Sequence, residues 1–305
     1  MSTLYEGQVI DSKLSLNAKG GTEMMRDRFL KMIEHSLYEN VAIHFSRPQK
    51  YHPETNIFYA HDLPDNDFLR QPKFDKYVFV SNYQRDKFMC HSRHVNHINS
   101  FVIENAIEEQ NPEENKNDDV CRLIYHTTPH RGLEHLVECF YKLYDEFGNK
   151  IHLDVFSSFE IYGWFNEQKW IDLFEKIKSH PGMTYHGYKS NEEVTNFLGQ
   201  KAHLFAYPSI WEETSCIAMI EALANKCFVI HPTYGALTET GMNLDLAMPY
   251  EISSESFYEK TKNFIEVFID DPHRFKERAN KFELPKKHSL EVYKKKWEKV
   301  LGKNE

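Results

Sequence analysis

The chain has 305 residues, of which 41% are hydrophobic, 14% aromatic and 27% charged, a composition typical of a folded globular protein. Acidic residues outnumber basic ones by 46 to 37. This argues against a nucleic acid partner, because phosphate contacts need clustered Lys and Arg. No apolar run approaches the roughly 18 residues of a membrane span, no signal peptide is visible, and the five cysteines form no CxxC pair. We therefore expect a cytoplasmic protein with reduced thiols.

The first third of the chain predicts a small α/β domain. A helix is expected after Gly20-Gly21, over residues 22–35, and strands are expected at 41–45, 57–60 and 77–80, before a short helix at 83–89. The stretch 108–119, EEQNPEENKNDD, is polar and acidic, and it is the clearest linker.

Beyond this linker, strand and helix signals alternate. Short apolar runs predict buried strands at 121–126, 151–156, 183–186, 202–207 and 227–231. Apolar stripes at helical spacing predict helices around 133–144, 170–177, 194–198 and 290–301. Such an alternation implies a mostly parallel sheet covered on both faces, with ligands bound beyond the carboxyl ends of its strands.

The segment 208–224, PSIWEETSCIAMIEALA, carries the sharpest functional signal. Seven residues separate Glu213 from Glu221, and a helix is expected to start near Thr214–Cys216. The N–H groups of Thr214, Ser215 and Cys216 would form an anion site, and a carboxylate beside them suits hydroxyl groups, so a sugar next to a phosphate is one interpretation. The other is that Glu213 only caps the helix and Glu221 lies on a solvated face.

This segment resembles the E-x7-E motif of retaining glycosyltransferases with the GT-B fold, glycosyltransferase family 4 in particular. Other segments resemble the same family in order and spacing: VSNYQ (80–84), VIENAI (102–107), YHTTPHRGL (125–133), YHGYKSNEEV (185–194) and GALTE (235–239). The resemblance implies two Rossmann-like domains with parallel sheets facing a cleft, the first one shortened. Residues 1–110, completed by a helix at 288–303, would form the acceptor side, and 111–287 would bind the donor.

What the resemblance implies about function is a retaining, metal-independent transfer from a nucleotide-diphospho-sugar to a glycan, lipid-linked or other hydroxyl acceptor, with no further cofactor. Glu213 would contact sugar hydroxyls, Glu221 the ribose, and Arg131 the departing diphosphate, whose negative charge develops during transfer. Thr214, Ser215, Cys216 and Tyr188 would also contact the donor. Two alternatives keep the fold: a degenerate protein that only binds nucleotide-sugars, and an epimerase or hydrolase.

Three positions depart from the family pattern. Tyr125-His126 stands where the family has a Gly-Arg pair, so one expected cation is missing. The family's E-G-F-G reads Glu213-Thr214-Ser215-Cys216 here, without glycines, and Ala106 replaces the Gly of P-N-G. We expect these departures to change phosphate binding and not the fold.

Two features of the first region resemble donor-side or acceptor-side groups of the family. Gly20-Gly21 resembles its N-terminal Gly-Gly loop, although a Gly-Gly before a helix is also a simple turn. His61, at a predicted strand end, is a candidate for contact with donor sugar or acceptor; otherwise it is a loop histidine bonded to backbone.

Three further patterns have bland interpretations that we prefer. Asp65-Asn66-Asp67 fits a metal-binding D-x-D, and Cys90, His91, His94 and His97 could ligate zinc, but both lie in polar stretches, so we predict no metal site. The lysine-rich tail helix could associate weakly with anionic lipid, yet its lysines more simply form a solvated face.

Overall fold

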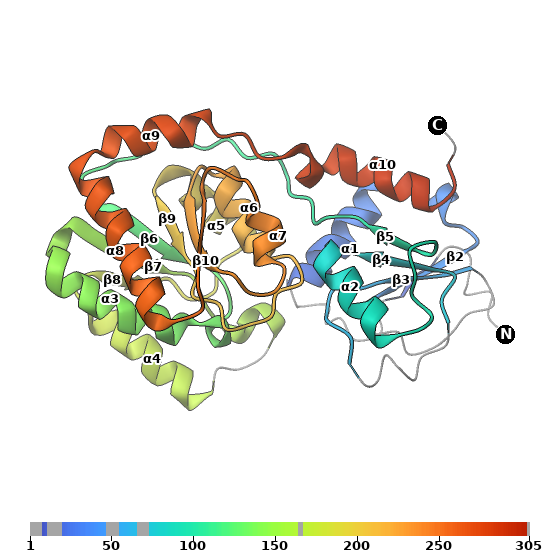
Figure 1. Ribbon diagram of the computed structural model, residues 1–305, viewed down its shortest axis with the longest axis horizontal. Coiled ribbons are helices and arrows are strands. Elements are labelled where there is room, and N and C mark those ends of the chain that lie inside the picture. The colour runs from blue at the N-terminus through green and yellow to red at the C-terminus, as the bar shows by residue number, and fades with distance from the viewer. Residues whose placement is uncertain (1–7, 11–19, 47–54, 66–72, 164–166, 304–305) are drawn as a thin grey trace. The chain divides into compact units, whose positions relative to one another are not determined.

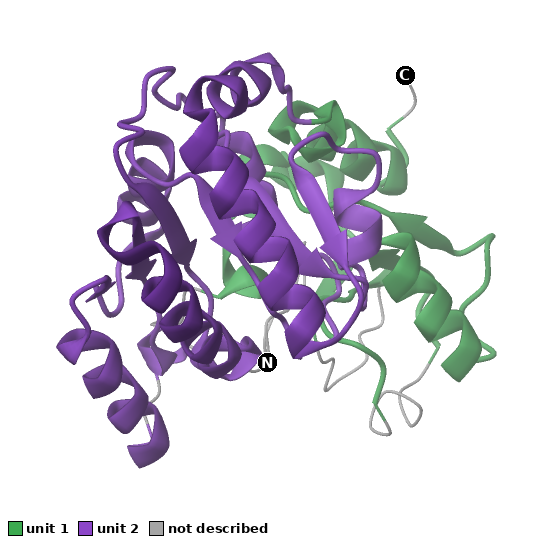
Figure 2. Ribbon diagram, turned by 60° about the vertical axis from the view of Figure 1, so that its left-hand side comes forward, with its two compact units in different colours: residues 1–108, 285–305 green, residues 109–284 purple. Residues whose placement is uncertain are grey.

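The computed structural model describes residues 8–10, 20–46, 55–65, 73–163 and 167–303. The chain divides into two compact units, shown in Figure 2. Unit 1 comprises residues 1–108 and 285–305, and unit 2 comprises residues 109–284. Each unit is an α/β structure built on a parallel sheet, so the predicted fold class is confirmed.

Unit 1 contains a sheet of order β1-β2-β3-β4-β5. All four strand pairs in it are parallel. Its strands are β1 (Gln8–Ile10), β2 (Val41–Phe45), β3 (Thr55–Tyr59), β4 (Lys76–Phe79) and β5 (Ser100–Val102), and its helices are α1 (Gly21–Met32), α2 (Asn82–His91) and α10 (Leu290–Val300) (Figure 1). The predicted strands at 41–45, 57–60 and 77–80 are therefore confirmed.

Aromatic side chains form much of the core of unit 1. Trp297 of α10 is fully buried and lies edge-on to Phe29 of α1 and to Tyr59 of β3, with ring centroids 4.8 and 5.0 Å apart. The apolar face of the lysine-rich tail helix is therefore buried in unit 1, whereas Lys295 and Lys299 are exposed and Lys296 is half-buried and bonded to Glu104.

Unit 2 contains a sheet of order β11-β10-β9-β6-β7-β8, all parallel. Its strands are β6 (Cys121–Tyr125), β7 (Ile151–Val155), β8 (Met183–Tyr185), β9 (Leu204–Ala206), β10 (Phe228–Pro232) and β11 (Ala247–Tyr250). Its helices are α3 (Leu133–Phe147), α4 (Gln168–Ser179), α5 (Asn191–Gln200), α6 (Ile217–Ala224), α7 (Leu237–Gly241), α8 (Ser254–Asp270) and α9 (Pro272–Lys281). The five predicted strands are confirmed, whereas β11, α7, α8 and α9 were not predicted.

The strand order of unit 2 reverses direction between β6 and β9. From β6 the chain builds outward through β7 and β8, and it then returns to add β9, β10 and β11 on the other side. In open parallel sheets, ligands bind beyond the carboxyl ends of the strands at such a reversal. The loops after β6 and β9 therefore define where a functional site is expected.

The segment predicted as a linker is held against unit 2. Lys116 is buried, and its ammonium donates hydrogen bonds of 2.7 Å to the carbonyl oxygens of Ala202 and Asn225. The amide of Glu113 donates to the carbonyl of Gly199. Polar composition predicts solvent exposure, but here a single lysine satisfies two buried carbonyl groups and fixes the segment.

None of the helices in the described ranges is long and apolar enough to span a lipid bilayer.

Candidate active site

Two loops flanking the strand-order reversal bring Arg131 and Glu213 together. Arg131 follows β6, and Glu213 follows β9. Arg131 Nη1 donates to Glu213 Oε1 at 2.5 Å, and both side chains are largely buried. Both predicted residues therefore follow strands at the reversal, and the structure shows that they form an ion pair.

Tyr207, which sequence reasoning did not select, completes this pair. It directly follows β9, is fully buried, and donates its hydroxyl to Glu213 Oε1 at 2.5 Å. Burial and the charge of Glu213 raise the pKa of Tyr207 well above its ordinary value. Burial is the largest single influence on Arg131 and would lower its pKa, but the charge and hydrogen bond of Glu213, together with Tyr207 and Tyr162, raise that pKa well above its ordinary value. Both groups therefore stay protonated and act as donors to the carboxylate.

Two glycines allow the site loops to touch. A Cβ on Gly132, whose φ is +118°, would lie 2.1 Å from the carbonyl oxygen of Pro208. A Cβ on Gly235, whose φ is +59°, would lie 2.8 Å from the backbone N and O of Glu213. The amide of Ala236 also donates to the Glu213 carbonyl at 2.8 Å. The loops after β6, β9 and β10 are therefore packed backbone to backbone around Glu213.

Helix α6 begins later than predicted, at Ile217, with Cys216 as its N-cap. Thr214 and Ser215 therefore lie in the preceding loop, where Thr240 Oγ1 donates to the Ser215 carbonyl at 2.7 Å. Cys216 is buried and has a φ of +78° and a ψ of 83°, the left-handed region that favours glycine. The glycine missing from the motif is thus replaced by a residue held in a glycine-like conformation.

The bland interpretations of the two glutamates are wrong. Helix α6 has no side-chain cap, and Glu213 bonds to Arg131 and Tyr207 instead. Glu221 is buried on α6 and accepts a hydrogen bond of 2.8 Å from Nδ2 of Asn191, the first residue of α5. Two buried, hydrogen-bonded carboxylates near the carboxyl ends of the strands are typical of a functional site.

Histidine takes the place of the family's missing arginine. His126 follows β6, and its Nε2–H donates to the carbonyl of Ala218 in α6 at 3.0 Å. Burial lowers the pKa of His126 to about 4, so its ring is neutral near pH 7. This position therefore contributes a structural hydrogen bond to α6 instead of a positive charge.

An aromatic cluster begins at Trp211, beside the guanidinium of Arg131. The Arg131 guanidinium lies 5.6 Å from the ring centroid of Trp211, which is 48% exposed. His130 lies edge-on to the same indole, at 5.1 Å between centroids, and stacks on Phe159 at 5.4 Å. Tyr188, exposed in the loop after β8, belongs to the same edge of the sheet. These side chains, Tyr188 excepted, escaped the sequence analysis because aromatic residues usually indicate core.

The remaining candidates belong to unit 1. Gly20 is the N-cap of α1, with an extended φ of −70°, and α1 begins at Gly21. His61 follows β3, stacks on Phe45 with centroids 5.7 Å apart, and lies 4.3 Å from the Tyr59 ring. Burial lowers its pKa to about 3. His61 lies just beyond the carboxyl end of β3, where ligands bind in parallel sheets.

Among the described residues, no three His, Cys, Asp or Glu side chains gather to hold a metal ion. Cys90 is exposed, and His91 Nδ1 donates to the Lys87 carbonyl at 2.8 Å. Of the D-x-D pattern, Asn66 and Asp67 lie outside the described residues.

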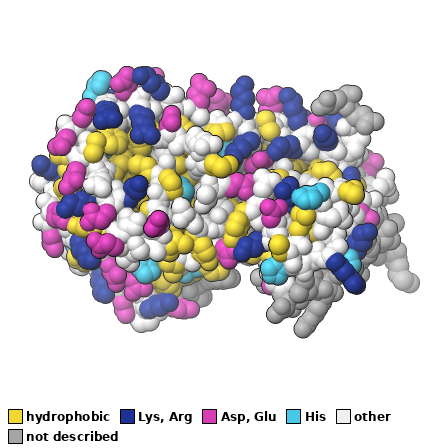
Figure 3. All heavy atoms as spheres, viewed as in Figure 1, with side chains coloured by type: hydrophobic (Ala, Val, Ile, Leu, Met, Phe, Trp, Pro, Cys, Tyr) yellow, Lys and Arg dark blue, Asp and Glu magenta, His cyan; other side chains and the backbone are white. Residues whose placement is uncertain are grey.

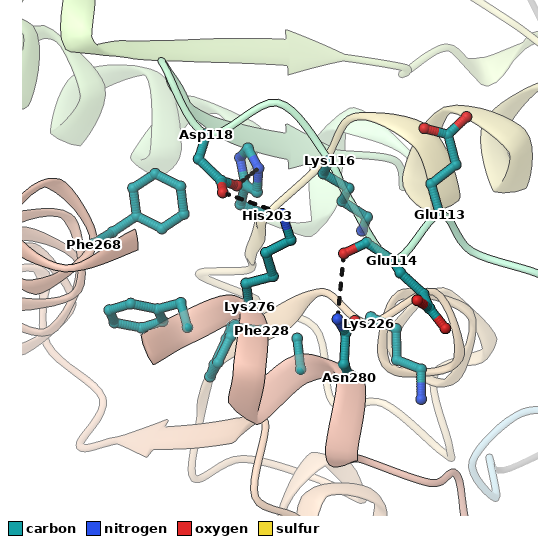
Figure 4. Close-up of a pocket in the computed structure, with 12 residues that line it drawn as sticks. Glu113, Glu114, Lys116, Asp118, His203, Lys226, Phe228, Phe268, Lys276 and Asn280 are labelled. Atoms are coloured by element: carbon teal, nitrogen blue, oxygen red, sulfur yellow. Dashed lines mark hydrogen bonds and ion pairs between the residues drawn. The ribbon is translucent and has the colours of Figure 1, made fainter. Parts of the chain in front are cut away.

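The pocket in Figure 4 lies at the amino ends of the unit 2 strands, away from the carboxyl ends where Arg131 and Glu213 lie. It is bordered by Phe228, the first residue of β10, by His203 just before β9, and by α8 and α9. Asp118 pairs with His203 at 3.5 Å and with Lys276 at 4.0 Å. Lys116 and Lys226 in its lining donate to backbone carbonyl oxygens, so these charged groups serve the packing of unit 2, and we assign the candidate active site to the Arg131–Glu213 edge.

Comparison with known proteins agrees with this geometry. Residues 105–289 match the family Glycosyl transferases group 1; the match spans more than half of the chain, which therefore belongs to this family. No curated protein matches the chain.

Solved structures with the same fold are GT-B glycosyltransferases. HepE from Anabaena, in complex with UDP and glucose, has 12% identity and a TM-score of 0.67, covering 94% of this chain and 85% of HepE. WaaG, a glycosyltransferase of lipopolysaccharide biosynthesis, has 13% identity and a TM-score of 0.66, covering 92% and 81%. TarM from S. aureus has 14% identity and a TM-score of 0.65, covering 93% of this chain but only 59% of TarM. At these identities the likeness shows the GT-B fold.

Proposed function

We propose that the chain transfers a sugar from a nucleotide-diphospho-sugar to a hydroxyl acceptor with retention of anomeric configuration. The observation that carries this proposal is the Glu213 carboxylate, anchored at the strand-order reversal through Oε1 alone. Within the described chain, Oε2 accepts no hydrogen bond, so it is available to a ligand hydroxyl. Membership in the glycosyl transferase family and the UDP and glucose bound to HepE support a nucleotide-sugar donor.

In this proposal the donor lies along the carboxyl edge of the unit 2 sheet. Glu213 accepts sugar hydroxyls, Glu221 hydrogen-bonds the ribose, and Thr214, Ser215, Cys216 and Tyr188 line the donor. Arg131 binds the diphosphate oxygens, bidentately where its planar guanidinium allows, as negative charge develops on the leaving group. No essential metal is needed in this scheme, since the guanidinium and the N–H groups at the start of α6 offset that charge.

Unit 1 is proposed to serve the acceptor, a carbohydrate or a lipid-linked hydroxyl. Gly20, Gly21 and His61 are the residues of this unit that are proposed to contact a ligand. His61, being neutral near pH 7, would act through hydrogen bonding and not through charge.

One observation favours a second candidate, a protein that binds nucleotide-sugars without turning them over. His126 is neutral and engaged with α6, so Arg131 is left to offset the diphosphate without the family's second cation. Weaker stabilisation of the leaving group slows transfer more than it weakens binding.

The donor class is tested first by thermal unfolding with UDP, GDP, ADP, CDP and TDP. A ligand at one hundred times its dissociation constant stabilises the folded state by roughly 2.7 kcal/mol, a shift of a few degrees. We expect one nucleotide to raise the melting temperature more than the others. The absence of a shift with all five, and with intact nucleotide-sugars, would contradict donor binding.

The role of Glu213 is tested by Glu213→Gln beside Glu212→Gln, a change of the neighbouring, less buried glutamate. We expect the first to lose at least about 100-fold in transfer while still binding the nucleoside diphosphate, and the second to keep its activity. Product analysis without acceptor separates transfer from epimerisation or hydrolysis. Equal activity of wild type and Glu213→Gln would remove Glu213 from the site.

A further inference from the structure

Tyr207 is connected to the candidate active site by the hydrogen bond from its hydroxyl to Glu213. Its backbone N–H donates to the Ile230 carbonyl at 2.9 Å, which continues the pairing of β9 with β10 by one residue. Its ring stacks on Phe205 with centroids 4.9 Å apart and lies 6.1 Å from Tyr125. A phenylalanine would pack equally well in these contacts, so the ring alone does not explain the hydroxyl.

The partner of that hydroxyl in the described chain is Glu213 Oε1, at 2.5 Å. Arg131 Nη1 donates to the same oxygen. The two donors come from different loops, after β9 and after β6, so together they hold the carboxylate in one orientation. Within the described chain Oε2 accepts no hydrogen bond, so it has capacity for a ligand hydroxyl.

The two anchors differ in how firmly they are committed to Glu213. The Arg131 side chain is 22% exposed, rests on the half-exposed Trp211, and is proposed to bind diphosphate. Tyr207 is fully buried, so its hydroxyl has no access to solvent. Breaking its hydrogen bond to Glu213 would therefore leave a buried polar group unpaired. When a diphosphate draws on Arg131, the phenol is the anchor that stays with Oε1.

We propose that Tyr207 is a positioning residue, which holds the Glu213 carboxylate so that Oε2 meets a hydroxyl of the donor sugar while Arg131 serves the diphosphate. This inference rests on the proposed function. It assigns to Tyr207 an effect on the sugar part of the donor and none on the nucleotide part.

The test is Tyr207→Phe, which removes one oxygen, with Tyr77→Phe as a matched control. Tyr77 is also fully buried, and its hydroxyl accepts a hydrogen bond of 3.0 Å from the Phe74 amide in unit 1. For Tyr207→Phe we expect kcat/KM for the nucleotide-sugar to fall roughly 10- to 100-fold, the range expected for a hydrogen bond to a charged group. The dissociation constant of the nucleoside diphosphate should change less than about two-fold. Tyr77→Phe should leave both values near wild type.

A double-mutant cycle with Glu213→Gln separates positioning from a general structural role. If Tyr207 acts through Glu213, adding Tyr207→Phe to Glu213→Gln changes kcat/KM little further, whereas independent effects would multiply. Multiplicative losses, an equal weakening of nucleoside diphosphate binding, or full activity of Tyr207→Phe would overturn the inference. Loss of activity in Glu213→Gln with none in Tyr207→Phe rejects this inference alone, while full activity in Glu213→Gln rejects the proposed function as well.

Discussion

Cys216 shows how one residue can replace a motif glycine at a cost. The left-handed conformation costs a side chain with a Cβ roughly 1–2 kcal/mol. Cys216 adopts it as the N-cap of α6, directly between the Glu213 loop and the helix that carries Glu221. Backbone strain of this kind persists where surrounding structure fixes the conformation, as the packed loops around Glu213 do here.

This strain predicts the relative stability of two variants. Both Cys216→Gly and Cys216→Ala remove the buried sulfur, but only glycine relieves the backbone. We expect the glycine variant to be about 1 kcal/mol more stable than the alanine variant in urea unfolding. An alanine variant as stable as the glycine variant would show that this backbone is not strained.

Single residues of the candidate site could be selected from sequence where a motif marks them, and were missed where no motif does. The seven-residue separation of Glu213 and Glu221 indicates a loop followed by a helix, and in the structure both side chains are buried in unit 2. Tyr207 escaped because it ends an apolar run and reads as core. Its ring is core, and only the position of its hydroxyl beside Glu213 reveals another role.

Among whole elements, the buried strands were the easiest to predict. Strands of a parallel sheet are covered on both faces, so they appear as mostly apolar runs such as 121–125 and 202–207, each with one polar residue. Strand β11 is an edge strand with the sequence AMPY, and proline is tolerated there because one side of the strand is unpaired. Helix α9, PHRFKERANK, buries mainly Ala279 and lacks a wide apolar stripe.

Helix α10 predicts a large difference between its two faces. Trp297→Ala removes a fully buried indole from contacts with Phe29 and Tyr59 and should cost about 3–5 kcal/mol. Lys295→Ala, on the exposed side, loses a surface pair with Glu291 and should leave the free energy of unfolding nearly unchanged, because solvent screens exposed pairs. Urea unfolding measures both. Similar costs for the two would mean that α10 does not complete the core of unit 1.

At the scale of the whole molecule, the face shown in Figure 3 carries mixed charges. On the face shown in Figure 3, acidic and basic side chains are interspersed over both units, so this face presents no large patch of one sign. The charge state that varies most near neutral pH belongs to histidine. Burial lowers the pKa of His126, His130 and His288 to about 4 and that of His61 to about 3, so each unit contains histidines that are neutral when folded.

These histidines predict acid sensitivity with a defined sign. An unfolded histidine titrates near its ordinary value of about 6.5, and the folded groups bind protons only near pH 4 or below. Between these values the unfolded state binds more protons, so stability is complete above about pH 6.5 and falls as the pH drops toward 4.

His288 allows this to be measured at one position. It is 3% exposed, and its Nδ1–H donates to the Asn105 carbonyl at 2.8 Å. In His288→Asn the side-chain amide can replace that donor without titrating. We therefore expect the loss of unfolding free energy between pH 7 and pH 4.5 to shrink by roughly 1–3 kcal/mol relative to wild type. The control is His97→Asn, an exposed histidine, which should keep the wild-type slope. If His288→Asn loses stability in acid as steeply as wild type, the protons taken up on acid unfolding bind to other groups. Burial of a neutral His288 would then not be a cause of the acid sensitivity.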